Sequence, residues 1–425
     1  MNDAKQAINR RNFFGLLGTG VSYGSLLAAA PAMASEELGW SRRDRPSAAV
    51  GVIVPRSHLY SGMGASFQAG LEMALGAFSL QGREIAAEVA MIDVGGAGLQ
   101  RVLTQMLSTH RPSIILGMLD ARLAEQAASI CASDALFIDC SAGAIVALAS
   151  RAQTRHLRCT LGQWQSAFAL GRWAAGQGKR AAILSTFYDA GYDGLYAFRL
   201  GFEEGGGEVP QAVIIDAPHK PLGIAAALTA VARQAPDVVY AAIHDHQAGP
   251  FMAAWSASPS AADVLLVANP FMVEHACQHA QLTPAEGVLV CSSYDPALAV
   301  PENQDFRRRF QERHQRMPDA YAVLGHDAGT LVATALGRAP AGASVQELMA
   351  ACTPFAIDSP RGRIAMDAEV GSLRMPHYLS LCSWSHAGLE RRIIDRVESI
   401  DETDPRMIAL RDGLRSGWVN PYMSV

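Results

Sequence analysis

Residues 50–75 read VGVIVPRSHLYSGMGASFQAGLEMAL and join an apolar strand to an amphipathic helix through one loop. The strand, residues 49–54, is apolar throughout, as strands buried on both faces of a sheet are. The helix, residues 65–78, repeats its apolar residues at the helical period. A buried strand followed closely by a helix predicts the first half of a β–α–β unit in a parallel sheet.

The same alternation continues along the chain in two series. The first has strands at residues 85–92, 113–116 and 135–139, with helices at 99–107 and 121–132. The second has helix-separated strands at residues 180–185, 212–215, 237–243 and 264–267. Each series spans about 110–130 residues, the size of an ordinary domain. We therefore expect an α/β protein of two doubly wound lobes rather than one oversized sheet.

The first 34 residues have the features of a twin-arginine export signal. Arg10 and Arg11 precede an apolar run at residues 13–30, and Ala32-Met33-Ala34 is a small-x-small cleavage site. Four glycines interrupt the run and make it too weak for a membrane-spanning helix. We expect residues 1–34 to be removed and the mature chain to be soluble in the periplasm.

The composition excludes several functional classes. Half of the chain is hydrophobic, 18% is charged and the net charge is −5, without a basic cluster. Binding to nucleic acid or to an anionic membrane needs such a cluster, so we expect neither. The sequence has no phosphate loop, dinucleotide fingerprint or paired-histidine metalloprotease motif. We therefore expect no enzymatic activity and no cofactor.

Cysteine and histidine patterns give no strong sign of a metal site. The seven cysteines have no C-x-x-C spacing, and their odd number leaves at least one thiol unpaired. Most of them are expected to be buried as small hydrophobic residues. One disulfide is possible, but the sequence does not indicate which pair forms it. His275 and His279 have the i, i+4 spacing of zinc ligands, but an exposed polar helix explains them better, so no metal is expected.

Four stretches in order, residues 50–75, 114–140, 188–192 and 321–336, resemble the type I periplasmic binding proteins of ABC transporters. The similarity is to the Leu/Ile/Val-binding branch and runs over residues 48–394. The resemblance implies two lobes joined by three crossings, with one solute held in the cleft. It places residues 46–157 and 293–355 in the first lobe and 158–292 and 356–400 in the second. Residues 401–425 are expected to form a helical tail, and the crossings are expected near residues 155–160, 290–295 and 353–360.

The positions that hold an amino acid in this family read differently here. In the family, two first-lobe loops bind the α-carboxylate, and acidic and tyrosine groups of the second lobe bind the ammonium. The second of these loops here reads Cys140-Ser141-Ala142-Gly143, Ala190 stands at the tyrosine position, and Asn269-Pro270-Phe271 replaces the stretch with glutamate. An ammonium buried without carboxylates would cost several kcal/mol. A standard amino acid is therefore disfavoured.

The candidate ligand contacts lie on loops expected at the cleft. Arg122, at the start of a helix, could bind a carboxylate or pair with Asp120 or Glu125. The aromatic candidates suit an apolar or ring-bearing solute, although core packing explains each one singly. The full set is Tyr60, Met63, Arg122, Ser141, Ala142, Gly143, Trp164, Tyr188, Tyr192, His244, Asn269 and Phe271.

Taken with the resemblance, these residues predict a monomeric periplasmic receptor that captures an apolar or aromatic carboxylate and delivers it to an inner-membrane ABC permease. Two alternatives remain open at this point. One is a ligand-sensing module for a membrane signalling partner. The other is a receptor for an amide- or urea-type solute. Asp358-Ser359-Pro360-Arg361-Gly362 resembles a late loop of such relatives, and we interpret it as structure at the third crossing.

Overall fold

The structure is a computed structural model of the chain and describes most of residues 48–400. The described residues are 48–56, 62–77, 79–80, 83–92, 98–119, 121–143, 156–186, 194–215, 222–243, 247–279, 285–385, 388–398 and 400. The expected export signal and the expected C-terminal tail both lie outside them.

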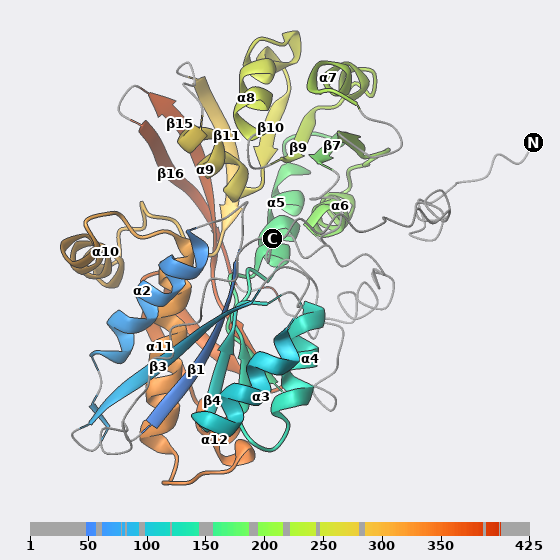
Figure 1. Ribbon diagram of the computed structural model, residues 1–425. Coiled ribbons are helices and arrows are strands. Elements are labelled where there is room, and N and C mark those ends of the chain that lie inside the picture. The colour runs from blue at the N-terminus through green and yellow to red at the C-terminus, as the bar shows by residue number, and fades with distance from the viewer. Residues whose placement is uncertain are drawn as a thin grey trace, which may run out of the picture.

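The chain folds into two α/β lobes, one above the other in Figure 1. The first lobe contains a nine-stranded sheet in the order β12-β13-β14-β6-β5-β4-β1-β3-β2. Its strands are β1 (Ala48–Pro55), β2 (Ser79–Leu80), β3 (Arg83–Ile92), β4 (Ile114–Gly117), β5 (Leu136–Asp139), β6 (His156–Arg158), β12 (Ala356–Ser359), β13 (Gly362–Asp367) and β14 (Ser372–Arg374). Its helices are α2 (Met63–Leu75), α3 (Leu99–Thr109), α4 (Ala121–Cys131), α11 (Ala320–Arg338) and α12 (Val345–Cys352).

The second lobe contains a seven-stranded sheet in the order β16-β15-β11-β10-β9-β7-β8. Its strands are β7 (Ala181–Thr186), β8 (Val213–Ile215), β9 (Val238–Ala242), β10 (Leu265–Ala268), β11 (Ala285–Ser292), β15 (His377–Ser385) and β16 (Gly388–Val397). Its helices are α5 (Gln163–Ala174), α6 (Gly194–Glu204), α7 (Ile224–Ala232), α8 (Ala248–Ser256) and α9 (Pro270–His279). In both sheets the central strands are parallel and an edge is antiparallel.

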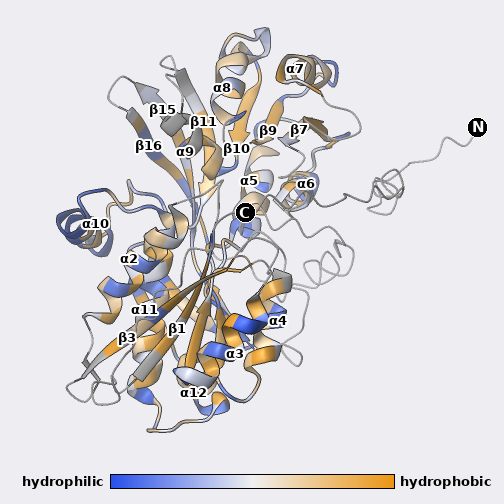
Figure 2. Cartoon of the chain, in the orientation of Figure 1, coloured by the Kyte–Doolittle hydropathy of each residue, from blue (hydrophilic) through white to orange (hydrophobic). Residues whose placement is uncertain are grey.

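Apolar residues on both faces of each strand produce this layered arrangement. Val52 packs in the cluster on one face of the first sheet, and its neighbour Ile53 packs in the cluster on the other. Ile183 and Leu184 of β7 divide in the same way between the two faces of the second sheet. Side chains alternate along a strand, so a continuous apolar run fills two cores at once. Figure 2 shows these strands as hydrophobic and α10 (Pro301–His314) as strongly hydrophilic.

Pairs of helices approach closely where each has a glycine. A Cβ atom on Gly70 of α2 would lie 1.8 Å from the Ala322 carbonyl oxygen of α11, and one on Gly325 of α11 would lie 1.9 Å from that of Phe67. Any side chain at either position would therefore force the two helices apart. This contact fixes α11, which comes late in the sequence, against the first helix of the same lobe.

The chain passes between the lobes three times, and the last passage differs from the expectation. It crosses between β6 and α5, between β11 and α10, and between β14 and β15. The resemblance places residues 356–374 in the second lobe, but β12, β13 and β14 extend the first sheet. Ser372 pairs with Arg158 of β6, which places this hairpin at the sheet edge of the first lobe. The third crossing is therefore at residues 375–376, not 353–360.

The last two strands form a hairpin at the edge of the second sheet. The strands expected near residues 378–382 and 392–394 are the longer antiparallel pair β15 and β16, which add an edge to the second sheet. Among the described residues, no helix combines the length and the apolar character needed to cross a membrane.

Candidate functional site

The candidate site lies where loops at the carboxyl ends of the strands of both lobes meet beside the crossings. The loop after β5 is bound to the first crossing by three backbone hydrogen bonds. Leu161, Gln163 and Trp164 donate their N–H groups to the carbonyls of Ser141, Ala142 and Gly143, at 3.3, 3.0 and 3.0 Å. In α/β proteins, ligands bind at this edge of the sheet, where loops and helix termini converge.

The loop of residues 140–143 is shaped by short internal hydrogen bonds. Asp139 Oδ1 accepts from the N–H of Ser141 at 2.9 Å, and Ser141 Oγ accepts from the N–H of Gly143 at 3.2 Å. Gly143 has φ +67°, and a Cβ there would lie 2.8 Å from Thr160 Oγ1. The buried N–H of Ala142 has no partner among the described residues.

Phe271 brings the second lobe into contact with the first. Its N–H donates to the Asn269 side-chain oxygen at 2.9 Å, which holds the chain as it turns from β10 into α9. The Phe271 ring stacks on Tyr321 of α11, with ring centroids 5.5 Å apart and an angle of 15° between planes. Because α9 belongs to the second lobe and α11 to the first, this aromatic pair spans the cleft.

A pocket of about 360 Å³, a volume that includes space open to solvent, lies beside this aromatic pair. Residues from both lobes and from the crossings line it, namely Leu161, Gln163, Ser166, Pro270, Phe271, Glu274, Ser292, Ser293, Tyr294 and Ala320. The lining mixes apolar surface with a few polar groups, as small-molecule sites do.

Glu274 is the one charged side chain in the described lining, and it belongs to a buried network. Arg391 Nη2 of β16 donates to Glu274 Oε1 at 2.7 Å, and Arg391 Nη1 lies 3.8 Å from Asp295 Oδ2. Asp295 also accepts from Ser380 Oγ at 2.5 Å and from the N–H of Ala297 at 2.7 Å. Burial raises the pKa of Glu274, and the positive charge of Arg391 partly opposes that shift.

Below the pocket, the fully buried guanidinium of Arg361 connects the three crossings. Its Nε is 2.7 Å from Asp327 Oδ2 on α11. Its Nη1 donates to the Thr160 carbonyl at 2.9 Å, to Ser293 Oγ at 3.4 Å and to Met375 Sδ at 3.2 Å. Thr160, Ser293 and Met375 belong to the first, second and third crossings respectively. One side chain therefore fixes the relative positions of all three passages between the lobes.

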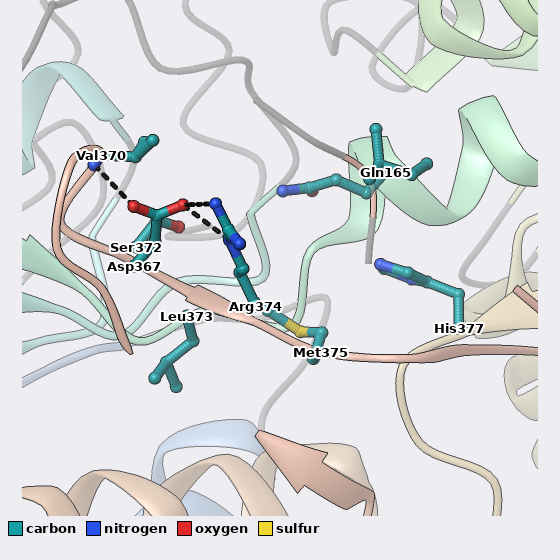
Figure 3. Close-up of a pocket in the computed structure, with 9 residues that line it drawn as sticks. Gln165, Asp367, Val370, Ser372, Leu373, Arg374, Met375 and His377 are labelled. Carbon is teal, nitrogen blue, oxygen red and sulfur yellow. Dashed lines mark hydrogen bonds and ion pairs between the residues drawn. The ribbon is translucent and has the colours of Figure 1, made fainter. Parts of the chain in front are cut away.

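A second, smaller pocket borders the third crossing (Figure 3). Asp367 closes the turn before β14, where its carboxylate accepts from the N–H of Val370 at 3.1 Å and from Arg374 Nε at 2.7 Å. On its other side, His377 Nδ1 lies 2.8 Å from Ser166 Oγ of α5. Burial lowers the pKa of His377 to about 3, and Arg361 adds to the shift. A neutral His377 therefore packs this crossing onto α5.

The structure places only part of the expected site at the cleft. Ser141, Ala142 and Gly143 lie in the loop after β5, and Asn269 and Phe271 lie where the chain turns from β10 into α9. Two others are buried in the cores, Met63 at the start of α2 in the first lobe and Trp164 in the second. Tyr60, Tyr188, Tyr192, His244 and the side chain of Arg122 lie outside the described residues.

Three residues at the cleft, Glu274, Tyr294 and Tyr321, are absent from the ligand contacts expected from the sequence. Glu274 follows Phe271 by three positions, the spacing that puts two residues on one helix face, so the sequence contained a signal for it. Tyr294, which lines the pocket, and Tyr321, which stacks on Phe271, had none, because the second crossing and the packing of α11 bring them to the cleft.

Cysteines and metal ligands give no second site in the described part of the chain. Cys131, Cys140, Cys159, Cys291 and Cys352 are buried thiols. No group of three or more His, Cys, Asp or Glu residues among the described ones could hold a metal ion. The side chains of His275, Cys277 and His279 lie outside them.

Residues 47–385 match the sequence model of a family described as periplasmic binding protein. No curated protein matches the chain at a significant level. Many solved structures share its fold, and they include receptors for different solutes. A solute-binding protein of an ABC transporter from Rhodopseudomonas palustris BisB5, in complex with 3,4-dihydroxybenzoic acid, is 22% identical with a TM-score of 0.69, over 84% of this chain and 98% of that one.

Another is an R. palustris solute-binding protein in complex with benzoate, 23% identical with a TM-score of 0.67, over 83% of this chain and 98% of that one. A further one is a leucine-, isoleucine-, valine-, threonine- and alanine-binding protein from Brucella ovis in a closed conformation. It is 15% identical with a TM-score of 0.68, over 84% of this chain and 97% of that one. At these identities the similarity shows the fold alone.

Proposed function

Because the chain belongs to the periplasmic binding protein family, we propose that it is the solute receptor of an ABC transporter. It captures one small solute in the cleft between its lobes and delivers it, as a monomer, to an inner-membrane permease. Ligand contacts to both lobes would stabilise a closed form, which the permease recognises. The protein needs no catalytic group for this role.

The single observation that carries the proposal is the Phe271–Tyr321 stack beside the pocket. A ring from each lobe, 5.5 Å apart, gives the cleft an aromatic wall that exists only when the lobes are close. A solute between the lobes adds contacts to this closed arrangement. Binding and closure are then coupled, as a receptor that reports its loaded state requires.

The solute class we propose is an apolar or aromatic carboxylate rather than a standard amino acid. The aromatic wall suits a ring, and the N–H of Ala142 offers a donor for a carboxylate. Proteins of the same fold have been solved with benzoate and with 3,4-dihydroxybenzoic acid, which supports this class over others. Arg391 is already paired with Glu274, so a ligand ammonium would compete with a buried cation.

Two measurements on the mature protein test the receptor function. A thermal-shift screen with aromatic acids, amides and amino acids should show one class raising the melting temperature, because a ligand that binds the folded state stabilises it. Small-angle scattering with the best solute should then show compaction. Stabilisation without compaction by every solute would contradict a closing receptor, and compaction by an amide or urea would replace the proposed solute class.

We also propose that the receptor acts in the periplasm after export by the twin-arginine route. Replacing Arg10 and Arg11 with lysine should leave the protein in the cytoplasm, because that route reads the arginine pair. The chain has a matched control, Arg42 and Arg43, which lie beyond the expected cleavage site. The same change there should leave export intact, and equal export of both variants would refute the route.

A further inference from the structure

The charge on Glu274 restricts what can lie in the pocket. Arg391 occupies Oε1 at 2.7 Å, and no described residue donates a hydrogen bond to Oε2. The side chain is 28% exposed and lines the pocket, so an acceptor oxygen faces the ligand space. A ligand carboxylate at this end would meet a like charge, whereas a ligand donor would complete the hydrogen bonding of Glu274.

The Tyr321 hydroxyl is a second polar group without a hydrogen-bond partner among the described residues, on the ring that stacks against Phe271. Tyr321 is 4% exposed, and its hydroxyl has no hydrogen-bond partner among the described residues. Its ring stacks on Phe271, which lines the pocket. Burial raises the pKa of this hydroxyl, and the negative charges of Asp319 and Glu274 add to the shift. A buried hydroxyl without a partner is costly unless a ligand supplies one.

The donor that fits is a neutral one. The buried cation of Arg391 balances the Glu274 carboxylate, and Asp295 receives hydrogen bonds from Ser380 and Ala297. A second cation would have to be desolvated next to Arg391. A hydroxyl avoids this cost, and it can donate to Glu274 while it accepts from Tyr321. Glu274 would thus be the acceptor, and Tyr321 the donor, for one ligand hydroxyl.

The carboxylate of such a ligand has a place at the other end. Gln163 connects the two ends, because it lines the pocket and its N–H donates to the Ala142 carbonyl at 3.0 Å. The ligand carboxylate would accept a hydrogen bond from the neighbouring N–H of Ala142, which belongs to the first lobe. We propose that Glu274 and Tyr321 determine specificity, and that the ligand is an aromatic acid with a ring hydroxyl opposite its carboxylate. This inference rests on the proposed receptor function.

Titration calorimetry with three acids of similar shape tests it. 4-Hydroxybenzoate can donate from its ring substituent, 4-methoxybenzoate can only accept there, and benzoate has no substituent. The wild-type protein should bind 4-hydroxybenzoate about 10- to 100-fold more tightly than either of the others, the effect of a hydrogen bond to a charged group. Equal affinity for all three acids would overturn the inference.

Variants assign the preference to its residues. In Glu274→Gln the remaining oxygen stays on Arg391 and the amide N–H₂ faces the ligand, so the preference for the hydroxyl should fall to less than about threefold. Glu203→Gln is the matched control, because it also neutralises the carboxylate of an Arg–Glu contact of 2.7 Å, with Arg199, on α6 of the second lobe. It should keep the wild-type preference. A loss of affinity in Glu274→Gln that is equal for all three acids would count against specificity.

Tyr321→Phe covers the case in which Glu274→Gln fails to fold because Arg391 has lost its negatively charged partner. It removes one hydroxyl and no protein hydrogen bond among the described residues, so the fold should be retained. Affinity for 4-hydroxybenzoate should fall by about 3- to 10-fold, with benzoate unchanged. If an amino acid or amide closes the protein and no aromatic acid binds, the receptor function stands and this inference falls. If no small solute binds or closes it, both fall.

Discussion

Arg361 and Asp327 form a buried ion pair, Nε to Oδ2 at 2.7 Å, at the place where the chain crosses between the lobes. Asp327 belongs to the first lobe through α11, and Arg361 follows β12 of the same lobe. The guanidinium then reaches residues of all three crossings. A receptor that closes about these crossings needs their relative positions to be fixed. The Arg361–Asp327 pair holds all three crossings at one point. The pair is thus part of the hinge rather than of the ligand site.

Replacing Arg361 with methionine should strongly destabilise the protein. The change leaves the Asp327 carboxylate buried without its cation, which costs about 3–5 kcal/mol. Arg363→Met is the control two residues away, because Arg363 is 63% exposed and pairs with the exposed Asp358. It should change the free energy of unfolding by less than about 0.5 kcal/mol. Urea denaturation measures both, and similar midpoints for the two variants would argue against an anchor at Arg361.

Acid should reduce stability through two buried histidines. Burial lowers the pKa of His377 to about 3 and that of His156 to about 4, from 6.5. The unfolded chain binds these two protons below pH 6.5 and the folded protein does not. Stability therefore falls as the pH drops from about 6.5 to about 4, at about 1.4 kcal/mol per pH unit for each histidine. Below about pH 4 only His377 continues to contribute.

The measurement is urea unfolding at several pH values between 7 and about 4. His377→Gln should flatten the curve over this range by about one histidine's share, because the group that titrates only in the unfolded state is gone. Parallel curves for the variant and the wild type would show that His377 is protonated equally in both states.

Gly325→Ala should destabilise the first lobe by about 1–3 kcal/mol, because the new methyl group would lie 1.9 Å from the Phe67 carbonyl oxygen. Gly337→Ala is a control on the same helix. A Cβ at Gly337 meets nothing within 4 Å, so the change should be neutral or stabilise by up to about 1 kcal/mol. Opposite shifts in melting temperature are expected, and a shared direction would mean that the helices separate at little cost.

Phe271→Leu should favour the open form of the receptor. It removes the ring that stacks on Tyr321, a contact of about 0.5–1.5 kcal/mol, so the affinity for the proposed ligand should fall about 2- to 10-fold. Scattering of the free variant should show a larger radius of gyration. Phe202→Leu, fully buried inside the second lobe, should lower stability and leave the radius unchanged. An unchanged radius for Phe271→Leu would show that the stack does not hold the lobes together.

The residues of β1, β4, β7 and β9 determined by themselves that the protein has parallel α/β layers. Their apolar runs can be buried only between two layers of helices, and that requirement is local to each strand. The sequence also determined the loops after β5 and β10 as cleft loops, because loops at the carboxyl ends of parallel strands converge. It could not place β12, β13 and β14. Their polar and mixed sequences do not state which sheet edge they join, and only pairing with β6 decides it.

The ligand pocket was decided almost wholly by tertiary structure. Met63 and Trp164 look like cleft residues in the sequence but fill the cores, because an apolar side chain near a loop can turn to either side. Glu274 and Tyr321 lie 47 positions apart, on α9 of the second lobe and α11 of the first, and only the stack of Phe271 on Tyr321 brings the two helices together. The Arg361–Asp327 pair likewise depends on the path of the third crossing. The local sequence specifies which residues are buried and the periodicity of a helix or strand. Residue pairs across a hinge depend instead on the relative position of the two lobes.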